Sequence, residues 1–384
     1  MENRLKVLIE GNSEANRTRW AMEWKKQGKK VIGVMSSYIP EEVISAAGML
    51  PWRITGTWQE NVSRVRVYRP ESSCAYCNHA LESFLRGELD FLDGIIVADI
   101  DQDLLRLWDV LVYLKAKPFC HFVHVPFVDS NLSQQFFTGE IRELVKNLED
   151  FGGVKITEDS LRSSIDTYNN MRDLLGKVYE LRKRETPPLS GAEILGITTS
   201  AQVMPREQFN HELEALLPYL EKRKANLKQV RPRLLVSSDM LDNPAYLSLV
   251  EEYCLVAMDD MDTGSRYFMQ NVDTTLEDPI YALAKRYLSH HGGPRMAHWD
   301  KQIDQLTKWV NDYSIDGVLS LPLAWCYPQQ FRMPYLSRKL SEEHVPNISL
   351  DREYHLANVG QLRTRIGAFI EMINNGPRET GDKD

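Results

Sequence analysis

Two cysteines three positions apart, Cys74 and Cys77, form a CxxC unit that is followed by His79. A CxxC unit lets two thiolates face one metal, so it suits a zinc site, an iron–sulfur site or a thiol redox site. A single unit does not distinguish these three chemistries. Zinc would call for a second CxxC or a Cys and His pair at fixed spacing, and neither follows in this sequence.

A further cysteine, Cys326, ends the apolar run DGVLSLPLAW and precedes Tyr327 and Pro328. It is therefore expected at the carboxyl end of a strand, where ligands lie in open parallel sheets. Cys254, within EEYCLVAM, is expected to be a small buried hydrophobe, and Cys120 has similar surroundings. Five cysteines in a chain of 384 residues do not indicate a disulfide framework, which leaves buried thiols or metal ligands.

Polar and acidic residues follow other expected strands. The segment DIDQD, at 99–103, could hold a cation, supply a general base or cap a helix. In DDMDTGSRY, at 259–267, backbone amides could meet a phosphate with Arg266 nearby, or the segment is an ordinary polar loop. Ser37, in SSYIPEEVISAAGMLP, also follows a strand, although its neighbours could simply cap the next helix.

The elements that must position these residues alternate between strand and helix. Short β-branched runs bounded by turn residues alternate with segments of helical periodicity in two series, which indicates parallel βαβ units. Strands are expected at 30–36, 51–55, 93–98 and 118–125, then from Arg231, near 254–258, at 316–321 and at 346–350. Helices are expected from 41, near 78, from 103, from 133 and at 359–373.

Between the two series, from about 157 to 228, long charged helical stretches replace the strands. The turn cluster TPPLSG at 186–191 breaks this region and is expected to be a hinge between helices. We therefore predict an α/β fold with an N-terminal lobe at 1–156, a helical connector at 157–230 and a C-terminal lobe at 231–384. The parallel sheets should be covered on both faces.

Charge and hydropathy exclude several classes of function. A net charge of -8 argues against binding to a nucleic-acid backbone. No stretch approaches the roughly 20 apolar residues that cross a bilayer, and the first residues lack the core of a signal peptide, so we expect a cytoplasmic protein. The sequence has no GxGxxG after a strand, no GxxxxGK and no GxSxG, which argues against dinucleotide binding, ATP hydrolysis and serine-hydrolase chemistry.

Five motifs in order, SSYIPEEVISAAGMLP, CAYCNHALESFLRGELDFLDG, DTGSRYF, DGVLSLPLAWCYP and GQLRTRIGAFIEMI, resemble the 2-hydroxyacyl-CoA dehydratase and benzoyl-CoA reductase family over nearly the whole chain. The resemblance implies two Rossmann-like lobes and a 4Fe-4S cluster held between them by cysteines of each lobe. It also implies a homologous sister subunit, an ATP-dependent iron–sulfur activator, ferredoxin as the electron source, and an acyl-CoA substrate reduced to a ketyl-type radical.

Carried over by residue, the resemblance implies Cys74 as the first cluster ligand and Cys326 as the last. Dehydratase subunits place a Cys-Asp pair after the third strand, where this chain has Asp101 and Gln102. Cys77 then supplies the missing thiolate, Asp101 ligates through oxygen, or one iron stays open to substrate or water. This departure, together with the segments NHALESFLRGELDFLDG and ADIDQDLLRLWDV, resembles an aromatic acyl-CoA reductase subunit of the benzoyl-CoA type more than a dehydratase subunit. A changed ligand is consequential because ligand identity affects the cluster potential.

Two other functions stay open, a 2-hydroxyacyl-CoA dehydratase subunit and a non-catalytic partner subunit that bears or has lost a cluster. For the chemistry itself, Ser37 and Asp101 are expected to form hydrogen bonds near the cluster, and His79 to shuttle protons. Arg266 is a candidate for contact with the CoA phosphates.

Overall fold

The computed structural model describes residues 1–224 and 232–375. Its first sheet has four parallel strands in the order β2-β1-β3-β4. They are β1 (Val31–Val34), β2 (Leu50–Arg53), β3 (Gly94–Ala98) and β4 (Phe119–Val123). Each overlaps a predicted strand, because apolar runs such as VIGV and GIIVA can be buried on both faces of a parallel sheet.

The second sheet repeats this arrangement in the order β6-β5-β7-β8, again with parallel strands. Its strands are β5 (Arg233–Ser237), β6 (Leu255–Asp260), β7 (Gly317–Ser320) and β8 (Asn347–Ser349). The predicted start of the first of them at Arg231 lies outside the described residues, and the four strands otherwise overlap the predicted ranges. The predicted α/β class with two parallel-sheet lobes is confirmed.

Helices follow most of the strands. In the first half these are α3 (Glu41–Ala46), α4 (Ala75–Leu85), α5 (Gln102–Tyr113) and α6 (Asn131–Gly152), with a short 3-10 helix, η1 (Arg64–Val67), before α4. In the second half they are α10 (Pro244–Val250), α11 (Ser265–Phe268), α12 (Pro279–Ser289), α13 (Trp299–Asp312), α14 (Tyr327–Glu342) and α15 (Val359–Asn375).

The region between the sheets is helical, as predicted, up to residue 224, and positions 225–230 lie outside the described residues. It contains α7 (Glu158–Leu181), α8 (Gly191–Ala201) and α9 (Arg206–Leu220). The predicted turn cluster separates α7 from α8, and Ser190 forms a capping box with Glu193 at the start of α8. Buried ion pairs join these helices to the N-terminal lobe, since Arg172 pairs with Glu42 and Arg206 with Glu41.

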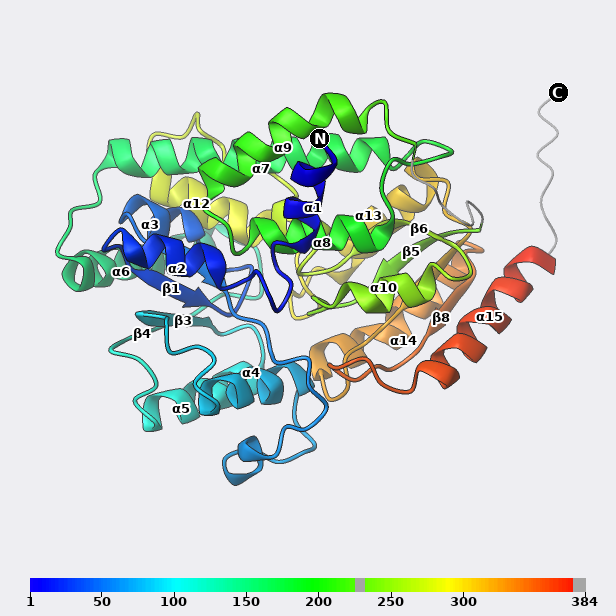
Figure 1. The fold of residues 1–384 in the computed structure, drawn as a ribbon, viewed down its shortest axis with the longest axis horizontal. Coiled ribbons are helices and arrows are strands. Elements are labelled where there is room, and N and C mark those ends of the chain that lie inside the picture. The colour runs from blue at the N-terminus through cyan, green and yellow to red at the C-terminus, as the bar shows by residue number, and fades with distance from the viewer. Residues whose placement is uncertain (225–231, 376–384) are drawn as a thin grey trace.

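Two helices that precede the first strand were not predicted, α1 (Glu2–Glu10) and α2 (Arg19–Lys26). Helix α1 packs against α8 and α9, so the chain begins on the helical layer that lies along the top of Figure 1. Helix α12, from the second half, packs against α6 of the first half. Helices from the two halves of the chain therefore pack against each other. The domain boundaries at 156 and 230 stay predictions.

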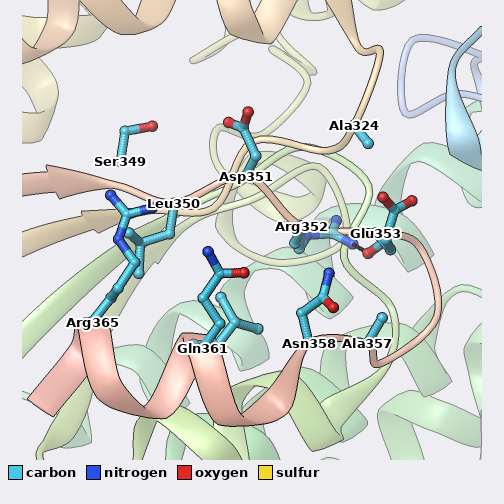
Figure 2. A pocket seen from close by; sticks show the side chains of 11 residues that line it. Ala324, Ser349, Leu350, Asp351, Arg352, Glu353, Ala357, Asn358, Gln361 and Arg365 are labelled. Atoms are coloured by element: carbon cyan, nitrogen blue, oxygen red, sulfur yellow. Dashed lines mark hydrogen bonds between the residues drawn. The ribbon is translucent and has the colours of Figure 1, made fainter. Parts of the chain in front are cut away.

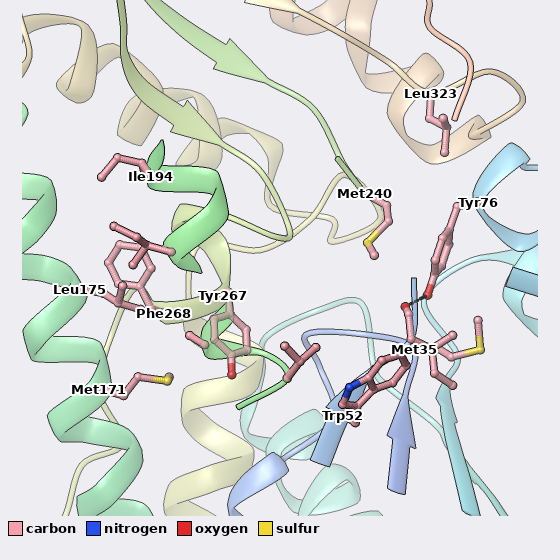
Figure 3. Close-up of a cluster of buried hydrophobic side chains, with 14 of the residues drawn as sticks. Met35, Trp52, Tyr76, Met171, Leu175, Ile194, Met240, Tyr267, Phe268 and Leu323 are labelled. Atoms are coloured by element: carbon pink, nitrogen blue, oxygen red, sulfur yellow. Dashed lines mark hydrogen bonds between the residues drawn. The ribbon is translucent and has the colours of Figure 1, made fainter. Parts of the chain in front are cut away.

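The largest hydrophobic core joins both lobes and the connector. Figure 3 shows Met35 and Trp52 from the first lobe, Met240 and Leu323 from the second, and Leu175 from α7 among its side chains. A shared core sets the two sheets in one relative position. Across the described ranges, no helix combines the length and the apolar character that crossing a bilayer requires.

Candidate functional site

Loops that follow the strands of the two sheets contact one another. The Ser37 hydroxyl, after β1, donates a hydrogen bond to the Asp262 carboxylate, after β6, and Arg53 at the end of β2 forms a salt bridge with the same carboxylate. The Tyr354 hydroxyl accepts from the Gly56 amide and donates to Asp242, both at 2.7 Å. All of these side chains are buried. The strand ends of the two lobes therefore face an enclosed junction.

Two of the cysteines lie at helix N-termini within this junction. Cys74 is the N-cap residue of α4, and Cys326 is the N-cap residue of α14. Trp325, just before Cys326, has a φ of 61°, which is rare for a bulky residue and turns the chain sharply into the helix. The positive end of a helix dipole stabilises a negative charge, so both positions favour a thiolate.

The three candidate thiol ligands interact with one another. Hydrogen bonds with Cys326 and Cys77 hold the pKa of Cys74 well below its ordinary value. The hydrogen bond with Cys74, together with burial, raises the pKa of Cys326, and burial raises the pKa of Cys77. One thiolate at Cys74 is thus stabilised by two neutral thiols. The structure brings together the residues that the sequence nominated as metal ligands.

A carboxylate from each lobe flanks these thiols. Asp101 is the N-cap residue of α5 and accepts a hydrogen bond from the Leu104 amide at 2.6 Å. Burial, with the nearby Cys74, raises its pKa to about 8. In the other lobe, Cys326 Sγ donates to Asp239 Oδ2 at 3.8 Å. Asp239 was not predicted from the sequence, although it comes two residues after β5, where the strand-end rule directs attention.

The donor atoms at this junction are of the kind that iron–sulfur groups use, since thiolates hold such clusters. Three buried thiols with a helix N-terminus behind two of them would neutralise and shield an iron–sulfur group. No group of three or more His, Cys, Asp or Glu residues in the described part of the chain is arranged to hold a metal ion. The fit therefore rests on the donor types and their enclosure.

His79 lies on α4, one and a half turns beyond Cys74, and packs against the ring of Tyr354. Its Nδ1 lies 2.7 Å from the carbonyl oxygen of Thr57, so Nδ1 carries the proton. Burial lowers the pKa of His79 to about 4. The imidazole is neutral at pH 7, and its predicted role as a proton shuttle stays a prediction.

Arg266 is buried among carboxylates of its own lobe. Its Nη2 lies 3.0 Å from Asp239 and its Nε 3.6 Å from Asp260, which also pairs with Arg332 at 2.8 Å. Nearby, Asp259 Oδ1 accepts from the Ser265 amide at 2.7 Å. Arg266 thus supports Asp239 beside Cys326, and its contact with CoA stays a prediction.

Cavities border the junction on two sides. One, of about 340 Å³, lies next to Ala324, two residues before Cys326. Figure 2 shows Gln361 and Arg365 on α15, and Asn358 just before this helix, pointing toward the segment that carries Asp351. A second cavity, of about 210 Å³, lies in the N-terminal lobe beyond β2 and includes Thr55 in its wall. Both lie where parallel sheets commonly bind ligands.

The comparisons with known proteins agree over nearly the full length. Residues 36–373 match the family model described as 2-hydroxyglutaryl-CoA dehydratase, D-component. A benzoyl-CoA reductase subunit of Thauera aromatica is 28% identical, with 92% of this chain and 94% of that protein covered. The beta subunit of (R)-2-hydroxyglutaryl-CoA dehydratase of Acidaminococcus fermentans is 27% identical, with 91% and 94% covered. The (R)-phenyllactyl-CoA dehydratase beta subunit of Clostridium sporogenes is 23% identical, with 93% and 96% covered.

Proposed function

The chain belongs to the family of the 2-hydroxyglutaryl-CoA dehydratase D-component, and on that premise we propose that it is the iron–sulfur subunit of an ATP-dependent, benzoyl-CoA-type aromatic acyl-CoA reductase. The family expected from the sequence motifs is thereby confirmed. In this proposal Cys74, Cys77 and Cys326 hold a 4Fe-4S cluster. When bound, the cluster supplies a low-potential electron to a CoA thioester.

The observation that supports this proposal most is the meeting of three thiols from two lobes at one buried junction. Cys74 and Cys326 lie 252 positions apart in the sequence. Buried thiols that have no bound group usually lie singly among apolar side chains, as Cys254 does. A set of three that contact one another, with two of them at helix N-termini, is better explained by a shared ligand.

The chain's own residues have three tasks in this proposal. The N-termini of α4 and α14 stabilise negative charge at Cys74 and Cys326. Asp262 contacts both Ser37 and Arg53, and these contacts close the junction between the lobes and keep water out. Asp101 forms hydrogen bonds beside the thiols, and His79 has an Nε2 free of the proton, which can accept one from substrate or water.

The partners in this proposal are a homologous sister subunit, an ATP-dependent iron–sulfur activator and ferredoxin, all in the cytoplasm. The names of the similar proteins describe each of them as a subunit, which supports a multi-subunit assembly. The chain has no phosphate-binding GxxxxGK motif, so ATP would be hydrolysed by another component.

A cysteine substitution tests the cluster. After anaerobic purification, Mössbauer spectroscopy of the wild-type chain should detect a 4Fe-4S cluster, and the Cys326→Ala variant should lose most of it. Cys254→Ala is the matched control, because Cys254 is equally buried but lies in the core of the C-terminal lobe. A Cys326→Ala variant that keeps the full iron content would refute the cluster assignment.

The main alternative is a 2-hydroxyacyl-CoA dehydratase subunit, and identities of 28% and 27% do not separate the two reactions. Our preference for the reductase rests on Asp101, which stands where dehydratase subunits have cysteine. Assays with activator, ATP and either benzoyl-CoA or a 2-hydroxyacyl-CoA separate the reactions. Turnover of the hydroxyacyl substrate alone would overturn the preference.

A second alternative is a non-catalytic subunit that relays electrons or completes the substrate pocket for its sister subunit. Its support is the same Asp101, since an incomplete thiol set suits a site that no longer reacts. If the assembled complex keeps full turnover after Cys74 and Cys326 are both replaced by alanine, the non-catalytic role is correct.

A further inference from the structure

A cavity of about 300 Å³ lies in the second half of the chain, between the end of α12 and the side of α13. Ser289, His290 and His291 line it from the end of α12, and His298 and Lys301 line it from the start of α13. None of the residues nominated from the sequence contributes to its wall. The cavity is therefore separate from the thiol junction.

Lys301 gives this cavity a positive charge that the protein does not balance. It is exposed in the first turn of α13, and among the described residues it pairs with no carboxylate. The described wall contains no Asp or Glu. Asp260, which accepts a hydrogen bond from His291, already pairs with Arg266 and Arg332. The charge that solvent can reach in the wall is cationic, so the expected ligand is an anion.

The start of α13 adds hydrogen-bond donors. The side chain of its N-cap residue, His298, makes no capping hydrogen bond. In the part of the chain that the structure describes, the backbone amides of residues 299–301 have no acceptor, and neither has the half-buried side-chain amide of Gln305. Uncapped amides at the N-terminus of a helix attract anions.

Two adjacent histidines each keep a basic nitrogen without a partner. His290 is buried, and its Nδ1 lies 2.8 Å from the Tyr287 carbonyl oxygen, so Nδ1 carries the proton and Nε2 is a free acceptor. His291 donates from Nε2 to Asp260 at 3.0 Å, which leaves Nδ1 as its free acceptor. Burial lowers the pKa of both imidazoles, so both are neutral at about pH 7.

These two nitrogens are open to the cavity, and no other described residue pairs with them. A ligand that satisfies the whole wall must therefore carry negative charge and also donate hydrogen bonds. Sulfate and carboxylates have the charge but carry no proton near neutral pH. A metal cation would suit the two imidazoles, but the ammonium group of Lys301 repels it. Inorganic phosphate has both properties, because it keeps O–H groups at neutral pH.

We propose that this cavity binds inorganic phosphate, with anionic oxygens on Lys301 and the first amides of α13 and with O–H groups that donate to His290 Nε2 and His291 Nδ1. The wall is already held in place, since Gln302 donates to the Gly293 carbonyl oxygen at 3.0 Å and accepts from Arg332 at 2.8 Å. Such preorganisation lowers the entropy cost of binding. The assignment is independent of the proposed function, because it requires neither a cluster nor an acyl-CoA.

Isothermal titration of the full-length chain at about pH 7 and constant ionic strength compares phosphate, sulfate and methyl phosphate. We expect saturable binding of phosphate. Sulfate should bind at least roughly tenfold more weakly, because it cannot donate to the two imidazoles. Methyl phosphate should also bind more weakly, since a phosphate monoester has lost most of its last proton near this pH. This third ligand distinguishes the free anion from the phosphate end of a metabolite.

A lysine substitution tests the charge. Lys301→Gln should weaken phosphate binding roughly tenfold, because a charge-assisted contact is lost. Its stability should not change, since the side chain is exposed and unpaired within the described chain. Lys308→Gln is the matched control, because Lys308 is exposed on the same helix but does not line the cavity. This control should bind phosphate as the wild type does.

A histidine substitution tests the contact with the phosphate O–H group. His290→Asn can keep a donor to the Tyr287 carbonyl oxygen but has no acceptor at the position of Nε2. The ratio of phosphate to sulfate affinity should therefore fall roughly threefold or more. Because both anions are measured on the same folded protein, lower stability alone does not change this ratio. A purely structural role for His290 predicts a lower denaturation midpoint with an unchanged ratio.

Three results would overturn the assignment: no binding of phosphate to the wild-type chain, equal affinity for phosphate and sulfate, or wild-type affinity in Lys301→Gln. Tighter binding of methyl phosphate would overturn it in favour of a phosphate ester. None of these results bears on the cluster, which the iron content of Cys326→Ala tests separately.

Discussion

The backbone amide of Ala75 donates a hydrogen bond to the carbonyl oxygen of Ala324 at 3.3 Å. Ala75 follows Cys74, and Ala324 comes two residues before Cys326, so a main-chain contact between the lobes sets the relative position of the two thiols. Substitution of a side chain does not remove this contact directly. The geometry of the cysteine pair therefore depends on how firmly the lobes are docked.

Asp262 is expected to stabilise that docking. It pairs with Arg53 and accepts from Ser37, and all three side chains are buried. Asp262→Asn would leave the Arg53 guanidinium without a counter-charge, so the free energy of unfolding should fall by about 3–5 kcal/mol in a denaturant titration. Glu23→Gln, which breaks the exposed pair with Arg19, should cost less than about 1 kcal/mol. Equal losses in the two variants would contradict this role.

Acid should unfold the protein partly through Asp260. Burial raises the pKa of this carboxyl, but Arg266, Arg332 and His291 outweigh burial and hold the pKa well below its ordinary value. A lowered pKa stabilises the fold above the unfolded pKa of about 3.9, and this contribution is lost as the pH falls below that value. We expect the free energy of unfolding to fall steeply below about pH 4.

Replacing the carboxyl isolates its contribution. Asp260→Asn should be several kcal/mol less stable at about pH 7, because Arg332 loses its carboxylate and Arg266 loses one of two. Its stability should also fall less steeply in acid. Asp304→Asn, at an exposed position, should follow the wild-type curve. An unchanged acid slope in Asp260→Asn would show that other groups control the acid transition.

Asp101 is expected to act first as a helix cap. Its carboxylate accepts from the Leu104 amide at 2.6 Å, so Asp101→Ala should lower the free energy of unfolding by about 1 kcal/mol. Asp101→Ser should recover most of that loss, since serine also caps helices well. Iron content of the anaerobic variants then decides between capping and ligation. If both variants lose iron equally, Asp101 is a cluster ligand as well as a cap.

Gly56 is expected to be irreplaceable for steric reasons. A Cβ at this position would lie 2.5 Å from His79 Cβ and 2.8 Å from the Tyr354 ring. Gly56→Ala should cost about 1–3 kcal/mol in chemical denaturation, because the two lobes meet tightly here. Gly139→Ala, in the open space along α6, should instead stabilise the protein by roughly 0.5–1 kcal/mol. Similar effects at both glycines would mean that the residues around Gly56 move to accommodate the added methyl group.

Local sequence patterns were sufficient for the strands and insufficient for some helices. The eight strands of the described residues overlap the predicted ranges. Runs such as VIGV and GIIVA were recognisable because strands buried on both faces of a parallel sheet are continuously apolar. Helices α1 and α2, of nine and eight residues, were missed. Segments this short span little more than two turns, so their periodicity is weak. Tertiary packing stabilises them, α1 on the connector helices and α2 on β1 and β2.

The chemistry of the junction was only partly accessible from the sequence. CxxC spacing and the strand-end position nominated Cys74, Cys77 and Cys326, whereas Asp239 beside Cys326 was not nominated. The sequence did not predict the pairing of Arg53 with Asp262 either, because the two residues lie 209 positions apart. A charged residue looks the same in sequence whether it is solvated, paired or facing a cavity.

The sequence by itself determined two parallel sheets, singled out Cys74 by its CxxC spacing and put Cys326 in the loop after a strand. Only the tertiary structure decided that these loops meet, that Cys77 joins them, and that Asp239 stands beside Cys326. Strand and helix formation depend on residues near in sequence, which leave a periodic pattern. The docking of two lobes depends on buried charges and a shared core drawn from distant segments, and no local pattern encodes it.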